Sequence, residues 1–166
     1  MRIWSKIVLV LYLLALLWLV LFKFSSDIFS ILAHHQATTI SLVPFVGNRL
    51  REMFDNFIFF VPLGLLLGIN YKLVSLKRKT AFVLVVSLVV EIIQFIFAIG
   101  IADITDVIMN TLGGFVGLAL YDVTLRRKNI KSDKLDLLLD VSITVVIAVL
   151  LAVFLYFRMF VLKVKY

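Results

Sequence analysis

The chain has 166 residues, of which 63% are hydrophobic and 16% charged, and its formal net charge is +7. A soluble globular chain is usually about 45–50% apolar, so this composition excludes a soluble domain and indicates an integral membrane protein. No cysteine is present, which excludes disulfides and leaves the compartment open. The positive charge lies in short loops, where it sets topology, and does not indicate a nucleic-acid partner.

Five apolar stretches are each close to the roughly 20 residues that a membrane-spanning helix needs. The first follows a basic segment, but it is too long for a cleaved signal peptide and lacks a small-x-small cleavage site, so it is interpreted as a retained anchor. Spans this close together leave no room for a second core. The whole chain, residues 1–166, is therefore expected to be one all-α transmembrane domain. The expected spans are residues 7–24, 56–71, 81–99, 104–121 and 137–160.

Lysine and arginine residues set the expected orientation. The loop between the second and third spans and the loop between the fourth and fifth spans are both basic, as is the N-terminus. The positive-inside rule therefore predicts a multi-pass protein with a cytoplasmic N-terminus. The turn between the third and fourth spans holds Asp103 and no base, so it is expected outside. Lys163 and Lys165 then fall outside as well, against the rule, which leaves the orientation of the last helix open.

A long outer loop, residues 25–55, joins the first two spans. Structureless loops of this length are unusual and often functional. Within it, residues 48–55 alternate apolar and charged side chains in a roughly helical way. This segment is predicted to lie in the membrane interface and to run into the second span.

Polar residues interrupt the third and fourth spans. Glu91 and Gln94 are three residues apart in the third span and share a helix face. In the fourth span five residues at helical spacing form one stripe along the helix. The stripe begins with acidic and amide side chains and continues with glycines. The stripe consists of Asp103, Asp106, Asn110, Gly113 and Gly117.

Glycines at a spacing of four allow two membrane helices to approach closely. The second span has such a pair in Gly64 and Gly68, and the fourth span has one in Gly113 and Gly117. These four residues are predicted to mediate helix packing. The polar side chains on the same stripe are therefore expected to face a neighbouring helix rather than lipid.

The polar residues are expected to meet in the outer half of the membrane. The third span runs outward from Lys79, and Glu91 lies about 18 Å further along it at about 1.5 Å per residue. The second and fourth spans enter from the same outer side. An ionisable residue inside the membrane is by default a functional-site hypothesis. The predicted pocket is formed by Asn56, Glu91, Gln94, Asp103, Asp106 and Asn110.

A structural interpretation of these residues stands beside the functional one. A protonated Glu91 could bond to Asn110 or Gln94 and join helices, at about 0.6–2 kcal/mol per bond. Asp103 taken singly is expected to be a helix N-cap, and Asp106 suits the first turn of the same helix. Several polar side chains directed at one place exceed what helix joining requires, so a ligand-binding or catalytic cavity is favoured.

The same residues carry a resemblance to a known family. In their order and spacing they resemble the VanZ-like family over about residues 9–122, and the last span lies outside the pattern. The matching elements are Leu42-Val43-Pro44-Phe45, Asn56-x-x-x-Phe60-x-Pro62-Leu63-Gly64, Glu91-x-x-Gln94 and Asp103-Ile104-x-Asp106-x-x-x-Asn110-x-x-Gly113.

The chain departs from the family pattern in two places. Many members have asparagine two residues before the -x-Pro-Phe element, where this chain has Ser41-Leu42-Val43-Pro44. Many members also have an arginine in the turn between the third and fourth spans, and this chain has none there. If that arginine binds an anion in relatives, its loss puts anion binding in doubt, although Arg49 or Arg51 could substitute from the long loop.

The family takes its name from a membrane protein that confers resistance to teicoplanin, a lipid-tailed glycopeptide. The resemblance therefore implies a bacterial cell membrane, an envelope role and reduced sensitivity to acylated glycopeptides. It supplies no reaction. No cofactor is expected, and the oligomeric state is not predicted.

The favoured function is binding without catalysis. The outward-facing pocket would take an amphiphile: the acyl tail of the drug, a membrane lipid, or a lipid-linked wall precursor. Pro62 is expected to bend or start the second span and to expose backbone carbonyls to the cavity, which the membrane tolerates only where protein surrounds them. Pro44, Phe45 and Phe60 are the remaining expected ligand-binding residues.

Two alternatives stay open. In the first, the protein is a membrane enzyme acting on a lipid-linked or wall-linked substrate. Glu91 would then be the catalytic acid or base, and Asp103, Asp106 and Asn110 would bind the substrate or a divalent cation. In the second, it is an accessory subunit that packs through its glycines against a partner in the envelope.

Overall fold

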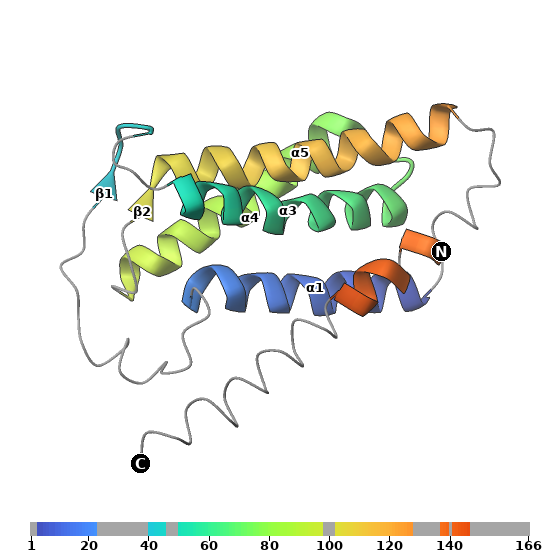
Figure 1. The fold of residues 1–166 in the computed structure, drawn as a ribbon, viewed down its shortest axis with the longest axis horizontal. Helices are drawn as coiled ribbons and strands as arrows, with labels where there is room; N and C mark the ends of the chain where they lie inside the picture. Colours follow the sequence, from blue (N-terminus) through green and yellow to red (C-terminus); the bar gives the residue numbers. More distant parts are fainter. Residues whose placement is uncertain are drawn as a thin grey trace, which may run out of the picture.

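A computed structural model describes residues 3–22, 40–45, 50–97, 102–127, 137–139 and 141–146. Its long elements are α1 (Ile3–Phe22), α3 (Leu50–Asn70), α4 (Leu76–Ile96) and α5 (Ile104–Arg127). All four helices are long and apolar enough to cross a membrane, and they correspond to the first four expected spans. Figure 1 shows α1, α3 and α5 running along the long axis, with α4 crossing obliquely.

The fifth expected span, residues 137–160, is described only in part. Residues 137–139 and 141–146 are helical. Within the described residues this helix is shorter than a membrane crossing. The rest of the expected span lies outside the described residues, as do Lys163 and Lys165. The described part of the chain thus contains four membrane-length helices rather than five.

Helix α3 begins earlier than hydropathy indicates. It runs unbroken from Leu50 to Asn70 and includes the charged residues before the expected span. The prediction that this segment runs into the second span is confirmed. Pro62 lies inside the helix, so the alternative that it starts the span is wrong, although its ring still removes one backbone donor.

Helices α3 and α5 pack in parallel through glycine. A Cβ atom at Gly113 would collide with the carbonyl oxygen of Phe57, and a Cβ atom at Gly117 would collide with that of Val61. Backbone atoms cannot move aside as the end of a side chain can, so both positions require glycine. The contacts advance together along the two helices, which means that they run in the same direction.

The glycines of α3 lie in the same contact. A Cβ atom at Gly64 would meet the carbonyl oxygen of Gly114, and one at Gly68 would lie 2.6 Å from Cδ1 of Tyr121. The neighbour of Gly64 is backbone, whereas the neighbour of Gly68 is the base of the buried Tyr121 side chain.

Two polar contacts join α1 to α3. The hydroxyl group of Tyr12 donates to the carbonyl oxygen of Phe59 at 2.6 Å. The amide Nδ2 of Asn70 donates to the carbonyl oxygen of Ser5 at 3.2 Å. Because Ser5 lies near the start of α1 and Asn70 ends α3, the two helices are antiparallel (Figure 1).

The apolar core lies between the four helices. Its fully buried members include Leu16 of α1, Phe60 and Leu63 of α3, Val90 of α4 and Leu118 of α5. The outer faces of the helices carry large exposed hydrophobic side chains. This combination suits a bundle surrounded by lipid, where apolar side chains need no cover from water.

Two short strands form an element that the all-α prediction did not include. β1 (Ile40–Ser41) pairs in parallel with β2 (Ala102–Asp103), which leads into α5. The pair holds residues 40–45 beside the start of α5 (Figure 1). Phe45 has φ 63°, a left-handed backbone conformation that is uncommon for an aromatic residue. Its N–H donates to Oγ1 of Thr105 at 3.0 Å.

Candidate functional site

Two carboxylates cap the start of α5. Oδ1 of Asp103 accepts a hydrogen bond from the N–H of Thr105 at 2.8 Å, which is the bond that an N-cap residue makes. Oε2 of Glu91 accepts one from the N–H of Asp103 at 2.9 Å. In a capping box a glutamate of the same helix would accept that N–H. Here the glutamate comes from α4, so the start of α5 depends on the neighbouring helix.

The polar stripe of α5 continues into its contact with α4. Asp106 and Asn110 are both buried, and Asn110 is 0% exposed. Nδ2 of Asn110 donates to Oγ of Ser87 at 2.9 Å. Ser87 lies one turn before Glu91 on the same face of α4, so the two hydrogen bonds are successive contacts of one interface.

Gln94 turns to a different neighbour. Its Nε2 donates to the carbonyl oxygen of Val20 in α1 at 3.2 Å. Gln94 and Glu91 lie on the inner side of α4, but they do not meet the same helix. The stretch that appears as one polar pair in the sequence therefore joins α4 to two different parts of the fold.

Asn56 is buried in α3. It directly precedes Phe57, whose carbonyl oxygen faces Gly113 of α5. This register brings Asn56 near the level of Asn110, although no hydrogen bond between them is recorded among the described residues.

Three amide atoms in this region lack a hydrogen-bond partner among the described residues. They are Nδ2 of Asn56, Oε1 of Gln94 and Oδ1 of Asn110. Buried polar groups are normally satisfied by protein, water or a ligand. The interior of the bundle thus retains hydrogen-bonding capacity that its own described side chains do not use.

A pocket of about 310 Å³ lies beside the two capping carboxylates. It is an open groove lined by residues 40–42, the second half of α4, β2 and the start of α5. Leu88 and Ile92 of α4 are among its walls and are also exposed on the outside of the bundle, so the pocket opens on an apolar surface. The lining residues are Ile40, Ser41, Leu42, Leu88, Glu91, Ile92, Phe95, Ala102, Asp103, Ile104 and Val107.

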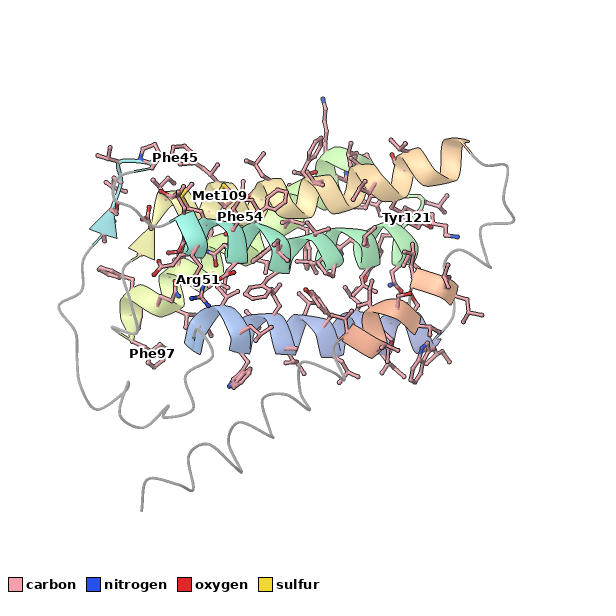
Figure 2. The ribbon with its side chains drawn as sticks, viewed as in Figure 1. Phe45, Arg51, Phe54, Phe97, Met109 and Tyr121 are labelled. Carbon is pink, nitrogen blue, oxygen red and sulfur yellow. The ribbon has the colours of Figure 1, made fainter. Side chains whose placement is uncertain are left out.

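Two of the expected ligand-binding residues, the capping carboxylates, line this pocket. Pro44 and Phe45 lie exposed beyond β1, and Figure 2 shows Phe45 at the edge of the molecule. Phe60 is in the core, and Pro62 is half-buried in α3. The other expected residues do not line this pocket and lie in buried helix contacts: Asn56, Gln94, Asp106 and Asn110.

Several residues of the site were not predicted from the sequence. Ser87 could have been found from its position one turn before Glu91. Oγ1 of Thr105 accepts the N–H of Phe45, and the N–H of Thr105 donates to Asp103. Nothing in the local sequence pattern indicates either contact. The apolar walls contributed by residues 40–42 depend on the pairing of β1 with β2, which the sequence does not indicate.

The described lining of the pocket contains carboxyl groups and no lysine or arginine. Arg51 has a 95% exposed side chain, and its Nε lies 3.9 Å from Oδ2 of Asp55. Arg49 lies outside the described residues. No group of three or more His, Cys, Asp or Glu in the described parts of the chain could hold a metal ion. The accessible surface of the pocket is thus almost entirely apolar, and the carboxyl groups of Glu91 and Asp103 lie buried beside it.

These features define a polytopic helical membrane protein with a pocket on the apolar side of its bundle. The chain belongs to the VanZ/LLP1 family, which it matches over residues 9–127. It is 49% identical to Protein VanZ of Enterococcus faecium over 154 residues, which cover 92% of this chain and 93% of that protein. No solved structure matches the chain. The family prediction is confirmed, and the protein is a multi-pass membrane protein of bacterial origin.

Proposed function

We propose that the protein lowers the sensitivity of the bacterial envelope to lipid-tailed glycopeptides such as teicoplanin by binding an amphiphile in the pocket between β1, α4 and α5. The observation that carries this proposal is the chemistry of the pocket walls. Exposed apolar side chains of α4 form much of a lining that is almost entirely apolar, and the carboxyl groups of Glu91 and Asp103 lie buried beside it. The tail of an amphiphile suits this lining because it can lie along α4, with its polar end toward the two carboxyl groups.

The occupant enters from the lipid phase, since the pocket opens among lipid-facing side chains. This route keeps an acyl tail out of water throughout. The acceptors of Glu91 and Asp103 favour a polar end that donates hydrogen bonds, such as a hydroxyl, amide or amine group. An acylated glycopeptide, a membrane lipid and a lipid-linked wall precursor all have an apolar tail that suits the pocket.

The orientation follows from the distribution of charge. We call the end of the bundle opposite the pocket the basic end; the bases there whose side chains are described are Lys6, Lys72, Lys77, Arg78 and Lys79. The positive-inside rule assigns this end, with the N-terminus, to the cytoplasm and directs the pocket toward the outer leaflet.

Drug susceptibility tests the proposal. A sensitive host would produce wild type, Leu88→Trp or Val89→Trp at matched levels, and teicoplanin would be compared with vancomycin, which lacks the acyl tail. Leu88 lines the pocket, whereas Val89 does not, and their exposed fractions are similar at 40% and 44%. Tryptophan at Leu88 is expected to fill the pocket and abolish protection against teicoplanin. Equal protection by both variants would contradict the proposal.

Catalysis by Glu91 is the second candidate, because its carboxyl group lines the pocket. Glu91→Gln keeps an acceptor oxygen for the N–H of Asp103 but cannot transfer a proton in the same way. A catalytic role predicts that this variant loses protection while still binding a labelled acylated glycopeptide or lipid. A binding role predicts that protection and binding decline together.

A further inference from the structure

Lys79 is the buried member of the basic end. Its side chain is 6% exposed, whereas Lys77 and Arg78, its neighbours in α4, are exposed. Lysine is rarely buried unless it is paired. The described residues provide no ion pair or hydrogen bond to the Lys79 ammonium group. This contrast distinguishes Lys79 from an ordinary surface lysine.

Helix register places the stem of Lys79 on the side of α4 that faces α5. Val83 packs against Gly114, where an added Cβ atom would lie 2.5 Å from Cγ1 of Val83. The helices are antiparallel, so Lys79, one turn earlier in α4, comes level with buried Leu118. The aliphatic part of the side chain is therefore held by packing.

The ammonium group points toward the end of the bundle. Helical side chains lean toward the N-terminus of their helix, and Lys79 lies in the first turn of α4. Long basic side chains bury the stem and keep the charged head at the interface. The exposed remainder of Lys79 is thus its ammonium group. Figure 2 labels Tyr121, which lies toward the basic end, and Phe45, which lies at the opposite end of the molecule.

The end of the bundle that holds Lys79 carries an excess of basic residues among those described. Lys72 lies in the turn before α4, and Lys77 and Arg78 lie in the first turn of α4. Asp122 is the acid on the facing stretch of α5. Asp122 already takes part in an interaction of its own. Among the described residues of this end, bases outnumber acids, which favours an anion over a further cation.

We propose that the basic end binds the phosphate group of an anionic membrane lipid, with the Lys79 ammonium as its central donor. A phosphate oxygen would supply the charge-assisted hydrogen bond that the described residues do not. Because the stem of Lys79 is buried, it loses less freedom on binding than the exposed side chain of Lys77. This site is separate from the pocket and does not depend on the proposed function.

The test compares thermal stability in lipid nanodiscs made of phosphatidylcholine, with and without phosphatidylglycerol. Wild type, Lys79→Gln, Lys77→Gln and Lys79→Arg would be measured at one physiological salt concentration. The two glutamine variants remove the same charge two residues apart, so they differ in burial and not in net charge. Phosphatidylglycerol is expected to raise the Tm of wild type, Lys77→Gln and Lys79→Arg, and to leave the Tm of Lys79→Gln unchanged.

Each variant is compared with itself in two lipid compositions, so a general loss of stability in Lys79→Gln does not affect the conclusion. An equal lipid-dependent rise in both glutamine variants would overturn the proposal. If both glutamine variants lost the lipid-dependent rise in Tm equally, the proposal would also be overturned, because that result would indicate diffuse attraction to the whole basic end. Inorganic phosphate is added to the phosphatidylcholine discs as a further arm. Full stabilisation by this free ion would overturn the assignment to a lipid.

Discussion

The side-chain oxygen Oε2 of Glu91 lies 2.9 Å from the backbone nitrogen of Asp103 and closes the N-terminus of a helix to which Glu91 does not belong. The same carboxyl group lines the pocket. The stability of α5 and the chemistry of the pocket therefore depend on one side chain. Substitutions at Glu91 must be chosen so that the two effects can be separated.

Glu91→Ala is expected to destabilise the protein by about 0.5–2 kcal/mol, the range measured for loss of a capping side chain. Glu91→Gln is expected to retain most of that stability, because its amide oxygen can still accept the N–H of Asp103. Unfolding in detergent micelles measures both variants. Equal destabilisation by alanine and glutamine would mean that the carboxylate charge, rather than the capping bond, is what matters.

Gly117→Ala is expected to destabilise the α3–α5 contact by about 1–3 kcal/mol, as overpacking does in cores. The added methyl group meets the carbonyl oxygen of Val61, which cannot rotate away. Gly68→Ala is the matched comparison, because its neighbour is the ring of Tyr121. The smaller effect is expected at Gly68 in the same unfolding assay, and the reverse order would contradict the packing described for α3 and α5.

Ser87 and Asn110 are expected to be energetically coupled. A double-mutant cycle with Ser87→Ala and Asn110→Ala should give a coupling of about 0.6 kcal/mol, with about 1.7 kcal/mol as the upper range for such bonds in membranes. The control cycle pairs Ser87→Ala with Gln94→Ala, since Gln94 bonds to α1 instead. Coupling in the control as large as in the test pair would show that the effect is not specific to the hydrogen bond.

The natural chain has no cysteine, so a single introduced cysteine reports its own location. Val43→Cys lies at the pocket end and Leu73→Cys in the turn at the basic end, and both positions are exposed. A membrane-impermeant maleimide is expected to label Val43→Cys in intact cells and Leu73→Cys only after permeabilisation. The opposite pattern would reverse the proposed orientation.

The helical period predicted the inner face of α5 well. The five residues of the stripe, from Asp103 to Gly117, are all buried. Their spacing repeats along one helix, so local sequence alone contains this information. For α4 the same reasoning was less complete. Glu91 and Gln94 are about 60° apart around the helix, which is enough to direct one toward β2 and the other toward α1.

Other features could not be predicted from local patterns. Hydropathy placed the start of the second span at Asn56, whereas α3 begins at Leu50. Backbone hydrogen bonds continue a helix through charged residues that a hydropathy window excludes. The pairing of β1 with β2 is a contact between distant segments, and short strands of two residues have no recognisable period.

That pairing has a consequence for how the protein is made. Residue Phe45 and its partner Thr105 are 60 residues apart in the chain. At about 5–20 residues per second, roughly 3 to 12 seconds separate their synthesis. During that interval the first strand has no partner, and the pocket has no second wall. Each new molecule therefore passes through a stage in which its first helices have been synthesised but its pocket does not exist, and the arrival of α5 completes it.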